Sequence, residues 1–465
     1  ILTSQLPNSQ GASALSLPRS PLLLLLVHQL FTSMEGSEDI EQAGVPPPPA
    51  QSQTEQRLTK AVSSKKRGRR LVRNRIPDDI LNDAALAKAI TLLPSNYHFE
   101  VPKTVWKIRV AREEAETAAA SAGLKNGAKQ SSDGIMVALQ LPEGLQMYAC
   151  VLADILEKFA QCKCTILGDV TYGACCISDL EAKALGCSLL VHYGHSCLVP
   201  VSVTCVKVLY VFVEISVAVD HLVECVKETL PAQTKIAVLG TIQFSGAVHN
   251  ARAKLAKHFA SSIVDQAKPL SPGEVLGCTS PVLTDVDALV FIADGRFHLE
   301  SAMIQNPTIE HYRYNPYNKV LSRERYDTAA MKSLRWDAIQ RARSAGCVGV
   351  ILGTLGRQGN PQILNHITSA VLRKGHKQYF IMLLSEIFPA KLEAFTTVEA
   401  WVQATCPRLS VDWGHHFSAP LLSAYEAEVA FAEGEWAGEV DKAYPMDYYR
   451  AGSGPWSNMH VKREF

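Results

Sequence analysis

Ile135-Met-Val-Ala-Leu-Gln-Leu141 is a short apolar run that predicts a buried strand, and a turn containing Pro142 and Gly144 follows it at once. Two later runs have the same character, Lys235–Gly240 (KIAVLG) and Val348–Gly353 (VGVILG), and each also ends at a turn and leads into a helix-like segment. The three runs start 100 and 113 residues apart. This spacing predicts three homologous units.

A second set of strand-like runs repeats in the same way. Its members start 52 or 53 residues after the first strand of their own unit, and each is followed by a polar turn: Ser188–Tyr193 (SLLVHY), Ala288–Ala293 (ALVFIA) and Ala400–Ala404 (AWVQA). Short apolar strands that alternate with amphipathic helices are typical of a parallel sheet covered by helices. The predicted fold class is therefore α/β, with three units whose parallel sheets are arranged in a triangle around a common centre.

The segments before the first strand read differently. Apolar residues recur at helical spacing from Ile80 to Ile90, behind Asp78 and Asp79, and Trp106 to Ala120 predicts a second helix. A polar loop covers residues 123–134. The predicted domains are an arm at 1–72, a helical lead-in at 73–134, α/β units at 135–231, 232–345 and 346–449, and a C-terminal tail at 450–465.

The N-terminal arm offers no core. Residues 35–75 are rich in Gln, Ser, Pro and charge, which predicts disorder. The basic run Lys65–Arg70 could serve nuclear import or contact RNA, or could simply be solvated. The apolar run Leu22–Phe31 has about half the length that a membrane-spanning helix needs. Because the chain begins with Ile1, we expect residues 1–33 to be upstream or fragmentary sequence and Met34 to be the natural start, which predicts a cytoplasmic location, with a nuclear one as an alternative.

Composition limits the partners. The chain has 465 residues, a formal net charge of +1 and 47% apolar residues, so it can bury several cores. With so little net charge, neither nucleic acid nor an anionic membrane is expected as the main partner.

Cysteine is abundant, with 12 residues, but its spacing does not form a short secreted disulfide framework. Six cysteines lie inside apolar runs and are interpreted as small core residues: Cys150, Cys162, Cys164, Cys187, Cys205 and Cys225. Three others lie in turns, which are Gly168-Asp-Val-Thr-Tyr-Gly-Ala-Cys175-Cys176, Pro272-Gly-Glu-Val-Leu-Gly-Cys278 and Ala404-Thr-Cys406-Pro. Turns beyond the carboxyl ends of parallel strands form the crevice where ligands bind.

The three turn cysteines are not equivalent. Cys175 and Cys278 occupy matching places in their units, whereas Cys406 follows the next strand of its unit. Three thiolates that meet at a common centre favour zinc or an iron–sulfur cluster and would leave one coordination position open. A noncatalytic α/β scaffold with a structural zinc site remains an alternative, although such sites usually have four ligands in paired CxxC spacings. Unrelated core or surface cysteines are the other alternative.

Eight motifs then identify a resemblance. GDVTYGACC, VHYGHSCL, KPLSPGEVLGCTSP, ADGRFHLES, YRYNPYNKVLSRE, ILGTLGRQG, LLSEIFPAKL and CPRLSVDWG occur in order between about Arg73 and Tyr449. They closely resemble the catalytic-subunit branch of the eukaryotic diphthamide biosynthesis family. The resemblance implies that Cys175, Cys278 and Cys406 bind a 4Fe-4S cluster, with Cys176 as a packing thiol beside it.

The resemblance also implies an activity. The chain would be a transferase, a noncanonical radical enzyme that cleaves S-adenosylmethionine and transfers its 3-amino-3-carboxypropyl group to imidazole C2 of a histidine in translation elongation factor 2. It implies a heterodimer with a paralogous second subunit, a CSL-type zinc-finger electron donor and an NADH-dependent reductase. The supporting paralogous subunit is a further alternative for this chain, against which the complete set of cysteines argues.

Two strand-end turns are candidates for binding S-adenosylmethionine, because backbone N–H groups, amides and Arg can hold a carboxylate or a ribose. Their candidate residues are Gln140, Glu143, Gly144, Gly353, Thr354, Gly356 and Arg357. Tight-turn or helix-cap roles are the alternative. His192, His195 and His298 could orient the substrate imidazole or could be structural, and Asp294 and Arg296 could pair with each other.

Overall fold

The first sheet is built from four parallel strands in the order β3-β2-β4-β5. They are β2 (Met136–Gln140), β3 (Lys163–Ile166), β4 (Leu189–Tyr193) and β5 (Lys207–Val211). All five residues of β4 are buried, including His192, because helices cover both faces of a parallel sheet. The computed structural model describes residues 75–121, 134–169, 173–373, 375–450 and 452–457. The predictions for the arm at 1–72, the Leu22–Phe31 and Lys65–Arg70 runs, the start at Met34 and most of the 123–134 loop lie outside these residues.

The second sheet repeats this pattern and adds one strand. Its order is β11-β10-β9-β7-β8, with β7 (Lys235–Gly240), β8 (Ser261–Ile263), β9 (Ala288–Ile292), β10 (Glu310–Asn315) and β11 (Val320–Glu324). The strand β11 runs antiparallel to β10, whereas the other pairs are parallel. The expectation of wholly parallel sheets therefore fails at this edge, where the short turn after Asn315 returns the chain directly as a hairpin.

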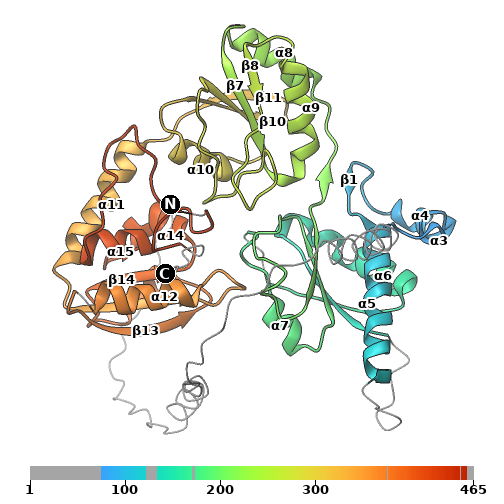
Figure 1. Ribbon diagram of the computed structural model, residues 1–465, viewed down its shortest axis with the longest axis horizontal. Coiled ribbons are helices and arrows are strands. Elements are labelled where there is room, and N and C mark those ends of the chain that lie inside the picture. Colours follow the sequence, from blue (N-terminus) through green and yellow to red (C-terminus); the bar gives the residue numbers. More distant parts are fainter. Residues whose placement is uncertain (1–74, 122–133, 170–172, 374, 451, 458–465) are drawn as a thin grey trace, which may run out of the picture. The chain divides into compact units, whose positions relative to one another are not determined.

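The third sheet has the order β13-β12-β14-β15 and is entirely parallel. It contains β12 (Cys347–Gly353), β13 (Gln378–Leu384), β14 (Ala400–Ala404) and β15 (Leu421–Leu422). In all three sheets the first strand is flanked by the second strand on one side and the third on the other. This shared order confirms three homologous α/β units, which Figure 1 shows as three separately covered sheets.

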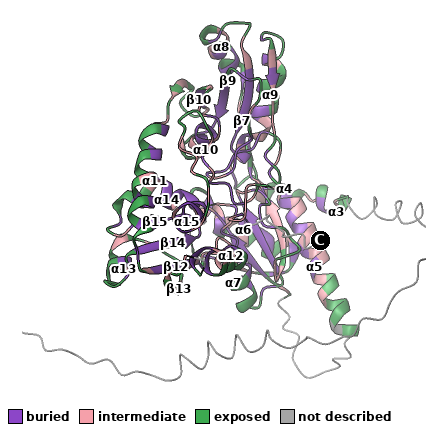
Figure 2. Ribbon diagram, turned by 60° about the vertical axis from the view of Figure 1, so that its left-hand side comes forward, coloured by how far each residue is buried: buried purple, intermediate pink, exposed green. Residues whose placement is uncertain are grey.

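Helices follow the strands and cover the sheets. They are α6 (Ala149–Ala160), α7 (Asp179–Ala184), α8 (Asp220–Thr229), α9 (Ser245–Leu255), α10 (Phe297–Gln305), α11 (Thr328–Arg343), α12 (Pro361–His366), α13 (Pro389–Glu393), α14 (Pro407–Trp413) and α15 (Ala424–Phe431). Short 3₁₀-helices also occur, among them η1 (Glu143–Tyr148), η2 (Ile242–Phe244) and η4 (Gly414–His416). A π-helical turn, η3 (Ile367–Leu372), follows α12. Figure 2 shows buried strands, with helices that are buried on one face and exposed on the other.

The lead-in is more divided than its apolar spacing predicts. Instead of one helix from Ile80 to Ile90, the chain forms α3 (Asp78–Leu81) and α4 (Ala84–Ile90). The break occurs because the side chain of Asp83 caps α4, accepting hydrogen bonds from the backbone N–H groups of Ala85 and Leu86. The second helix, α5 (Val101–Ser121), is longer than predicted, and β1 (Tyr97–His98) pairs antiparallel with β6 (Glu214–Ile215).

Three helices that precede the first strand of a unit pack on the sheet that follows them. Helix α5 buries Val105 and Ile108 against the first sheet, α8 shares a core with the second sheet, and α11 shares a core with the third sheet. Each repeat thus includes the helix before its first strand. The boundaries predicted at 231/232 and 345/346 instead assign α8 and α11 to the preceding units, because strand spacing alone does not reveal on which sheet a connecting helix packs.

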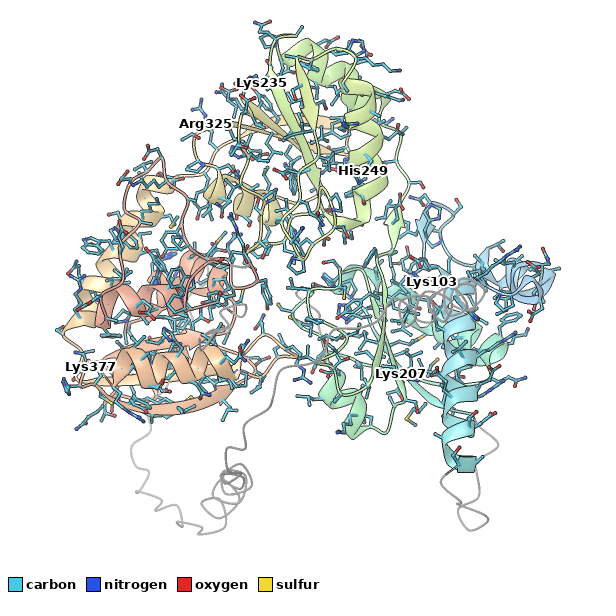
Figure 3. All side chains as sticks on the ribbon, viewed as in Figure 1. Lys103, Lys207, Lys235, His249, Arg325 and Lys377 are labelled. Carbon is cyan, nitrogen blue, oxygen red and sulfur yellow. The ribbon has the colours of Figure 1, made fainter. Side chains whose placement is uncertain are left out.

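In each sheet, the parallel strands start at one edge and end at the edge that carries the cysteine turn. Lys207 and Lys235 begin β5 and β7, and Lys377 immediately precedes β13. Figure 3 shows each of these lysines at one end of its own sheet. The cysteine-containing turns follow the opposite, carboxyl ends of β3, β8 and β14. The described residues from Ile76 onward form one compact unit.

Candidate metal centre

The first cysteine turn follows β3, and the side chain of a glutamine at the end of β2 forms hydrogen bonds with it. The amide nitrogen of Gln140 donates to the carbonyl oxygen of Cys176 at 2.7 Å and to the hydroxyl of Ser178 at 3.1 Å. Its amide oxygen accepts the N–H of Ser178 at 3.1 Å and lies 2.9 Å from Nδ1 of His192. Gln140 is buried, so its hydrogen-bonding groups fix the turn that presents Cys175.

The third cysteine turn is also held by the side chain of a buried glutamine, which lies on β14. Gln403, near the end of β14, donates to the carbonyl oxygen of Cys406 at 2.9 Å and to the hydroxyl of Ser410 at 3.0 Å. Its amide oxygen accepts the N–H of Thr405 at 2.8 Å. Cys406 is the N-cap residue of α14, whose first residue is Pro407. A buried glutamine therefore shapes both cysteine turns, although no sequence motif links the two positions.

The second cysteine turn closes on itself. The N–H of Leu276 donates to the carbonyl oxygen of Thr279 at 2.9 Å across Cys278. Gly277 is required there, because a Cβ atom at this position would lie 2.2 Å from the ring of Phe297. The sulfur of Cys278 lies 3.7 Å from the hydroxyl of Thr279. The turn is thus compact and presents one thiol at its tip.

The three thiols are close enough to interact electrostatically. Each of Cys175, Cys278 and Cys406 is half-buried. The pKa of Cys175 is raised well above its ordinary value, first by its contact with Cys176, then by burial and by the charges of Cys406 and Cys278. Burial, followed by the charge of Cys406, raises the pKa of Cys278, and burial is the main cause of the raised pKa of Cys406. Without a cation, this group of thiols resists ionisation.

Among the described residues, no three His, Cys, Asp or Glu side chains are grouped to hold a single metal ion. The thiols from the three sheets are related by longer-range charge interactions instead. Thiolate ligands of an iron–sulfur cluster bind different iron atoms, so they need not converge on one point. The donor set of three sulfurs fits an iron–sulfur centre.

Arg357 joins the third unit to the first cysteine turn. Its backbone N–H donates to the carbonyl oxygen of Cys175 at 3.0 Å, and its guanidinium makes two 2.7 Å bonds to the buried carboxylate of Asp179 on α7. Gly356 allows this approach, because it has φ +55° and a Cβ there would lie 2.4 Å from the carbonyl carbon of Cys176. The Gly353–Gln358 turn is therefore a docking element for the Cys175 turn.

Arg408 joins the third unit to the second cysteine turn. It lies two residues after Cys406 and donates to the carbonyl oxygens of Gly277 at 3.0 Å and Phe297 at 2.9 Å. Its guanidinium also pairs with Glu300 at 2.5 Å and with Asp412 at 2.9 Å. One buried side chain therefore links the residue that precedes Cys278 to the helix that begins at Cys406.

Sequence reasoning missed a C-terminal contribution to the site. The carboxylate of Asp447 accepts a 3.0 Å hydrogen bond from the hydroxyl of Thr279, next to Cys278. Tyr449, two residues later, packs against the same apolar cluster as Cys175, formed by Ala174, Leu198, Leu270 and Leu276. No local signal marks these residues in the sequence, because they lie in an irregular segment 168 positions from Thr279.

The candidate residues for S-adenosylmethionine divide into two groups. Gln140, Gly353, Gly356 and Arg357 are engaged within the protein: a Cβ on Gly353 would lie 2.5 Å from Thr405, and the other three hold the Cys175 turn. Glu143 and Gly144 begin η1 on an exposed turn, and a Cβ on Gly144 would meet no heavy atom within 4 Å. Thr354 is also exposed. Glu143, Gly144 and Thr354 are therefore the predicted residues that remain accessible to a ligand.

The three histidines singled out in the sequence, His192, His195 and His298, lie near one another, and the rings of His192 and His195 are 5.4 Å apart. His192 is buried, and burial lowers its pKa well below the ordinary value. Burial also lowers the pKa of His195 and of His298 to about 4, with a further contribution to His195 from His298. All three are therefore neutral at pH 7. The suggested pairing of Asp294 with Arg296 is wrong, because Arg296 pairs with Glu300 at 2.8 Å and with Glu324 at 2.6 Å.

Comparison with known proteins assigns this architecture. The model of the diphthamide synthesis protein family matches residues 141–441. The chain belongs to the diphthamide synthesis protein family. It is 48% identical over 405 residues to 2-(3-amino-3-carboxypropyl)histidine synthase subunit 1 of Schizosaccharomyces pombe, covering 85% of this chain and 87% of that protein. The human protein of the same name is 49% identical over 398 residues, covering 85% of this chain and 84% of that protein.

Solved structures of this family have the same fold. The crystal structure of Dph2 from Pyrococcus horikoshii is 28% identical with a TM-score of 0.56, covering 71% of this chain and 93% of that one. A second crystal structure of that protein, with a 4Fe-4S cluster, is 27% identical with the same TM-score of 0.56 and covers 71% and 94% of the two chains. The α/β architecture of three sheets predicted from the sequence is therefore confirmed, and so is the resemblance to this family.

Proposed function

We propose that this chain is the catalytic subunit for the first step of diphthamide synthesis. In this reaction the 3-amino-3-carboxypropyl group of S-adenosylmethionine is transferred to imidazole C2 of a histidine in translation elongation factor 2. The observation that carries the proposal is the set of three cysteines, Cys175, Cys278 and Cys406, each of which follows a strand of a different sheet. The name and fold of its relatives support the same activity.

The proposed cofactor is a 4Fe-4S cluster held by these three thiolates. Such a cluster supplies an iron with an open coordination position and the electron that cleaves the Cγ–S bond of S-adenosylmethionine. The chain supplies the shape of the site. Gln140 and Gln403 fix the backbone of two cysteine turns, and the third unit holds all three turns together through Arg357 and Arg408.

The neutral histidines suit this role. Because His192, His195 and His298 carry no charge at pH 7, they add no positive charge beside the thiolates and leave the cluster potential to other groups. A neutral imidazole can also accept a hydrogen bond from a substrate group. We assign these residues to positioning and not to proton transfer, since cleavage of the Cγ–S bond requires no general base.

The co-substrate needs accessible polar groups near the carboxyl ends of the strands. We assign first contact with S-adenosylmethionine to the exposed turn of Glu143 and Gly144 and to Thr354. Glu143 can pair with the α-ammonium group of S-adenosylmethionine. Arg357 is an interunit contact in this proposal, because Asp179 already occupies its guanidinium.

The partners follow from the same proposal. The relatives are named as subunit 1 of a synthase, which implies more than one subunit. We propose a heterodimer with the paralogous second subunit, with electrons delivered by a CSL-type zinc-finger protein and an NADH-dependent reductase, in the cytoplasm. No helix among the described residues has the length and apolar character to cross a membrane.

Anaerobic reconstitution tests the proposal. The chain and its second subunit are treated with iron and sulfide, and iron content, visible absorption and cleavage of S-adenosylmethionine are measured. We expect about one cluster per chain, and each of Cys175→Ala, Cys278→Ala and Cys406→Ala should reduce cleavage by more than about 100-fold, beyond the loss of an outer-shell partner.

A matched control separates ligands from other cysteines. The interpretation of Cys150 as a core residue is wrong, because its thiol is exposed on α6. Cys150→Ala should therefore leave the cluster and the activity unchanged. The zinc-scaffold alternative predicts bound zinc, no iron–sulfur absorption and no cleavage. Full activity in all three ligand variants would disprove the assignment of the cluster to these cysteines.

A further inference from the structure

The C-terminal segment Tyr444–Arg450 brings a buried carboxylate to the second cysteine turn. The N–H of Tyr444 donates to the carbonyl oxygen of Ile304 on α10, in the second unit, at 3.4 Å. The hydroxyl of Tyr448 accepts the N–H of Ala424 at the start of α15, in the third unit, at 3.3 Å. The residue before Tyr448 is Asp447, which is only 6% exposed. The segment is therefore attached to two units, and its acidic side chain is turned away from solvent.

The two carboxylate oxygens of Asp447 have different surroundings. Oδ1 accepts three hydrogen bonds, from the hydroxyl of Thr279 at 3.0 Å, from the N–H of Tyr449 at 2.8 Å and from the N–H of Arg450 at 3.1 Å. Oδ2 is buried and has no hydrogen-bond partner within the part of the chain that the structure describes. A buried acceptor without a partner costs stability, so packing alone does not account for an acidic residue at this position.

The hydroxyl of Thr279 lies between Asp447 and Cys278. Its oxygen is 3.0 Å from Oδ1 of Asp447 and 3.7 Å from Sγ of Cys278. A threonine hydroxyl has one proton to donate, and sulfur is a weak acceptor, so the proton is directed to the nearer carboxylate oxygen. Only the lone pairs of the hydroxyl oxygen remain for the sulfur. Thr279 can therefore accept a hydrogen bond from the Cys278 thiol but donates none to the thiolate.

We propose that Asp447 is a positioning residue for the metal centre, which directs the Thr279 hydroxyl away from the Cys278 thiolate and so keeps the reduction potential of the bound cluster low. This inference rests on the proposed function. Hydrogen bonds donated to the sulfurs of an iron–sulfur cluster help to set its potential, because they disperse the negative charge that reduction adds. A thiolate without such a donor makes the reduced state less stable. Cleavage of the Cγ–S bond takes up one electron, and a low potential favours its delivery.

Removal of the acceptor tests the proposal. The full chain with its second subunit is reconstituted anaerobically, iron content is measured, and the midpoint potential is determined by redox titration with electron paramagnetic resonance. Asp447→Ala frees the Thr279 hydroxyl to donate to the Cys278 thiolate, so we expect a midpoint potential shifted to a more positive value. Asp447→Ala combined with Thr279→Val has no hydroxyl to donate and should lose most of that shift.

Thr279→Val alone provides a second test that keeps the carboxylate in place. Valine has nearly the shape of threonine, so this variant decides the matter even where Asp447→Ala lowers the iron content. Because the hydroxyl donates nothing to the sulfur, its removal should not move the midpoint to a more negative value. The matched control is Thr368→Val, which removes a buried hydroxyl that donates to the carbonyl oxygen of Leu364 one helical turn away. Its midpoint should equal that of the unaltered chain.

The possible results separate this inference from the proposed function. A negative shift in Thr279→Val would show that Thr279 donates to the thiolate and would overturn the inference. So would an intact cluster with an unshifted midpoint in Asp447→Ala, or a positive shift that persists in full in the double variant, since the lost charge alone would then explain it. All three results leave the proposed function standing. Failure of the unaltered chain to assemble a cluster overturns both proposals.

Discussion

Arg357 and Arg408 perform the same task in different surroundings. Each follows a strand of the third unit, and each reaches across to the cysteine turn of another unit. The side chain of Arg357 is 29% exposed and pairs with one carboxylate, whereas that of Arg408 is 3% exposed and pairs with two carboxylates and two carbonyl oxygens. Arg357 therefore lies at the solvent-exposed edge of the contact between the third and first units, which we call the edge. Arg408 is buried in the contact between the third and second units, which we call the seam.

This difference in burial indicates which of the two arginine contacts contributes more to the geometry of the metal centre. Loss of Arg357 leaves one carboxylate, Asp179, which keeps a hydrogen bond from Cys205, whereas loss of Arg408 leaves two carboxylates without their shared cation. Removal of one partner from a buried ion pair leaves the other charge uncompensated, which costs more than the intact pair contributes. We therefore expect the Cys278–Cys406 link to be the more sensitive of the two.

The largest expected effect comes from Arg408→Gln. It leaves Glu300 and Asp412 without their shared cation, and we expect a loss of about 3–5 kcal/mol in unfolding free energy, together with a low cluster content. Arg357→Gln should cost about 1–3 kcal/mol, because Asp179 keeps its 2.7 Å hydrogen bond from the N–H of Cys205. Denaturant unfolding followed by tryptophan fluorescence measures both values. Equal losses would contradict the distinction between edge and seam.

A smaller effect is expected at the glycine that lets Arg357 approach. Gly356→Ala places a Cβ within 2.4 Å of the Cys176 backbone at φ +55°. We expect a cost of about 1–3 kcal/mol from backbone strain, together with weaker cluster retention. Gly144→Ala is the matched control, since a Cβ there meets nothing within 4 Å, and it should change stability by less than about 0.5 kcal/mol. The same unfolding assay tests both, and similar losses would refute the docking role of Gly356.

The smallest effect is a pH dependence that differs between the two links. Burial alone would raise the pKa of Asp179, but hydrogen bonds from Arg357 and Cys205 outweigh it, and the pKa is lowered. The stability that Asp179 contributes is thus present above its unfolded pKa of about 3.9 and is lost as the pH falls through the lower folded value. Burial raises the pKa of Asp412 despite Arg408, so its effect has the opposite sign.

Asp179→Asn measures this dependence. We expect the variant to be less stable than the unaltered chain by about 1–2 kcal/mol at pH 7, because the amide bonds less strongly to Arg357. The difference should shrink below about pH 4, where the carboxyl group takes up a proton. Urea unfolding of both proteins at pH 7 and at pH 3.5 provides the comparison. A difference that stays constant across this range would show that the charge of Asp179 is not responsible.

The sequence by itself determined the units and the cysteines. Buried strands such as Lys235–Gly240 and Ala400–Ala404 appear with the predicted bounds, because a strand covered on both faces needs a continuous apolar run. The repeat also predicted that Cys406 follows the third strand of its unit, whereas Cys175 and Cys278 follow the second strand, as the structure has them. These features depend on short segments and on their spacing along the chain.

Only the tertiary structure decided how the units meet. Three features join residues that are distant in the sequence: the packing of α8 and α11 on the following sheets, the ion pair of Arg357 with Asp179, and the packing of Cys175 and Tyr449 against one apolar cluster. A single side chain such as Arg357 reads equally well as a ligand for a carboxylate substrate or as a partner for a carboxylate of the protein. The physical reason is that pairing depends on which surfaces the folded units bring together, and no local pattern records this.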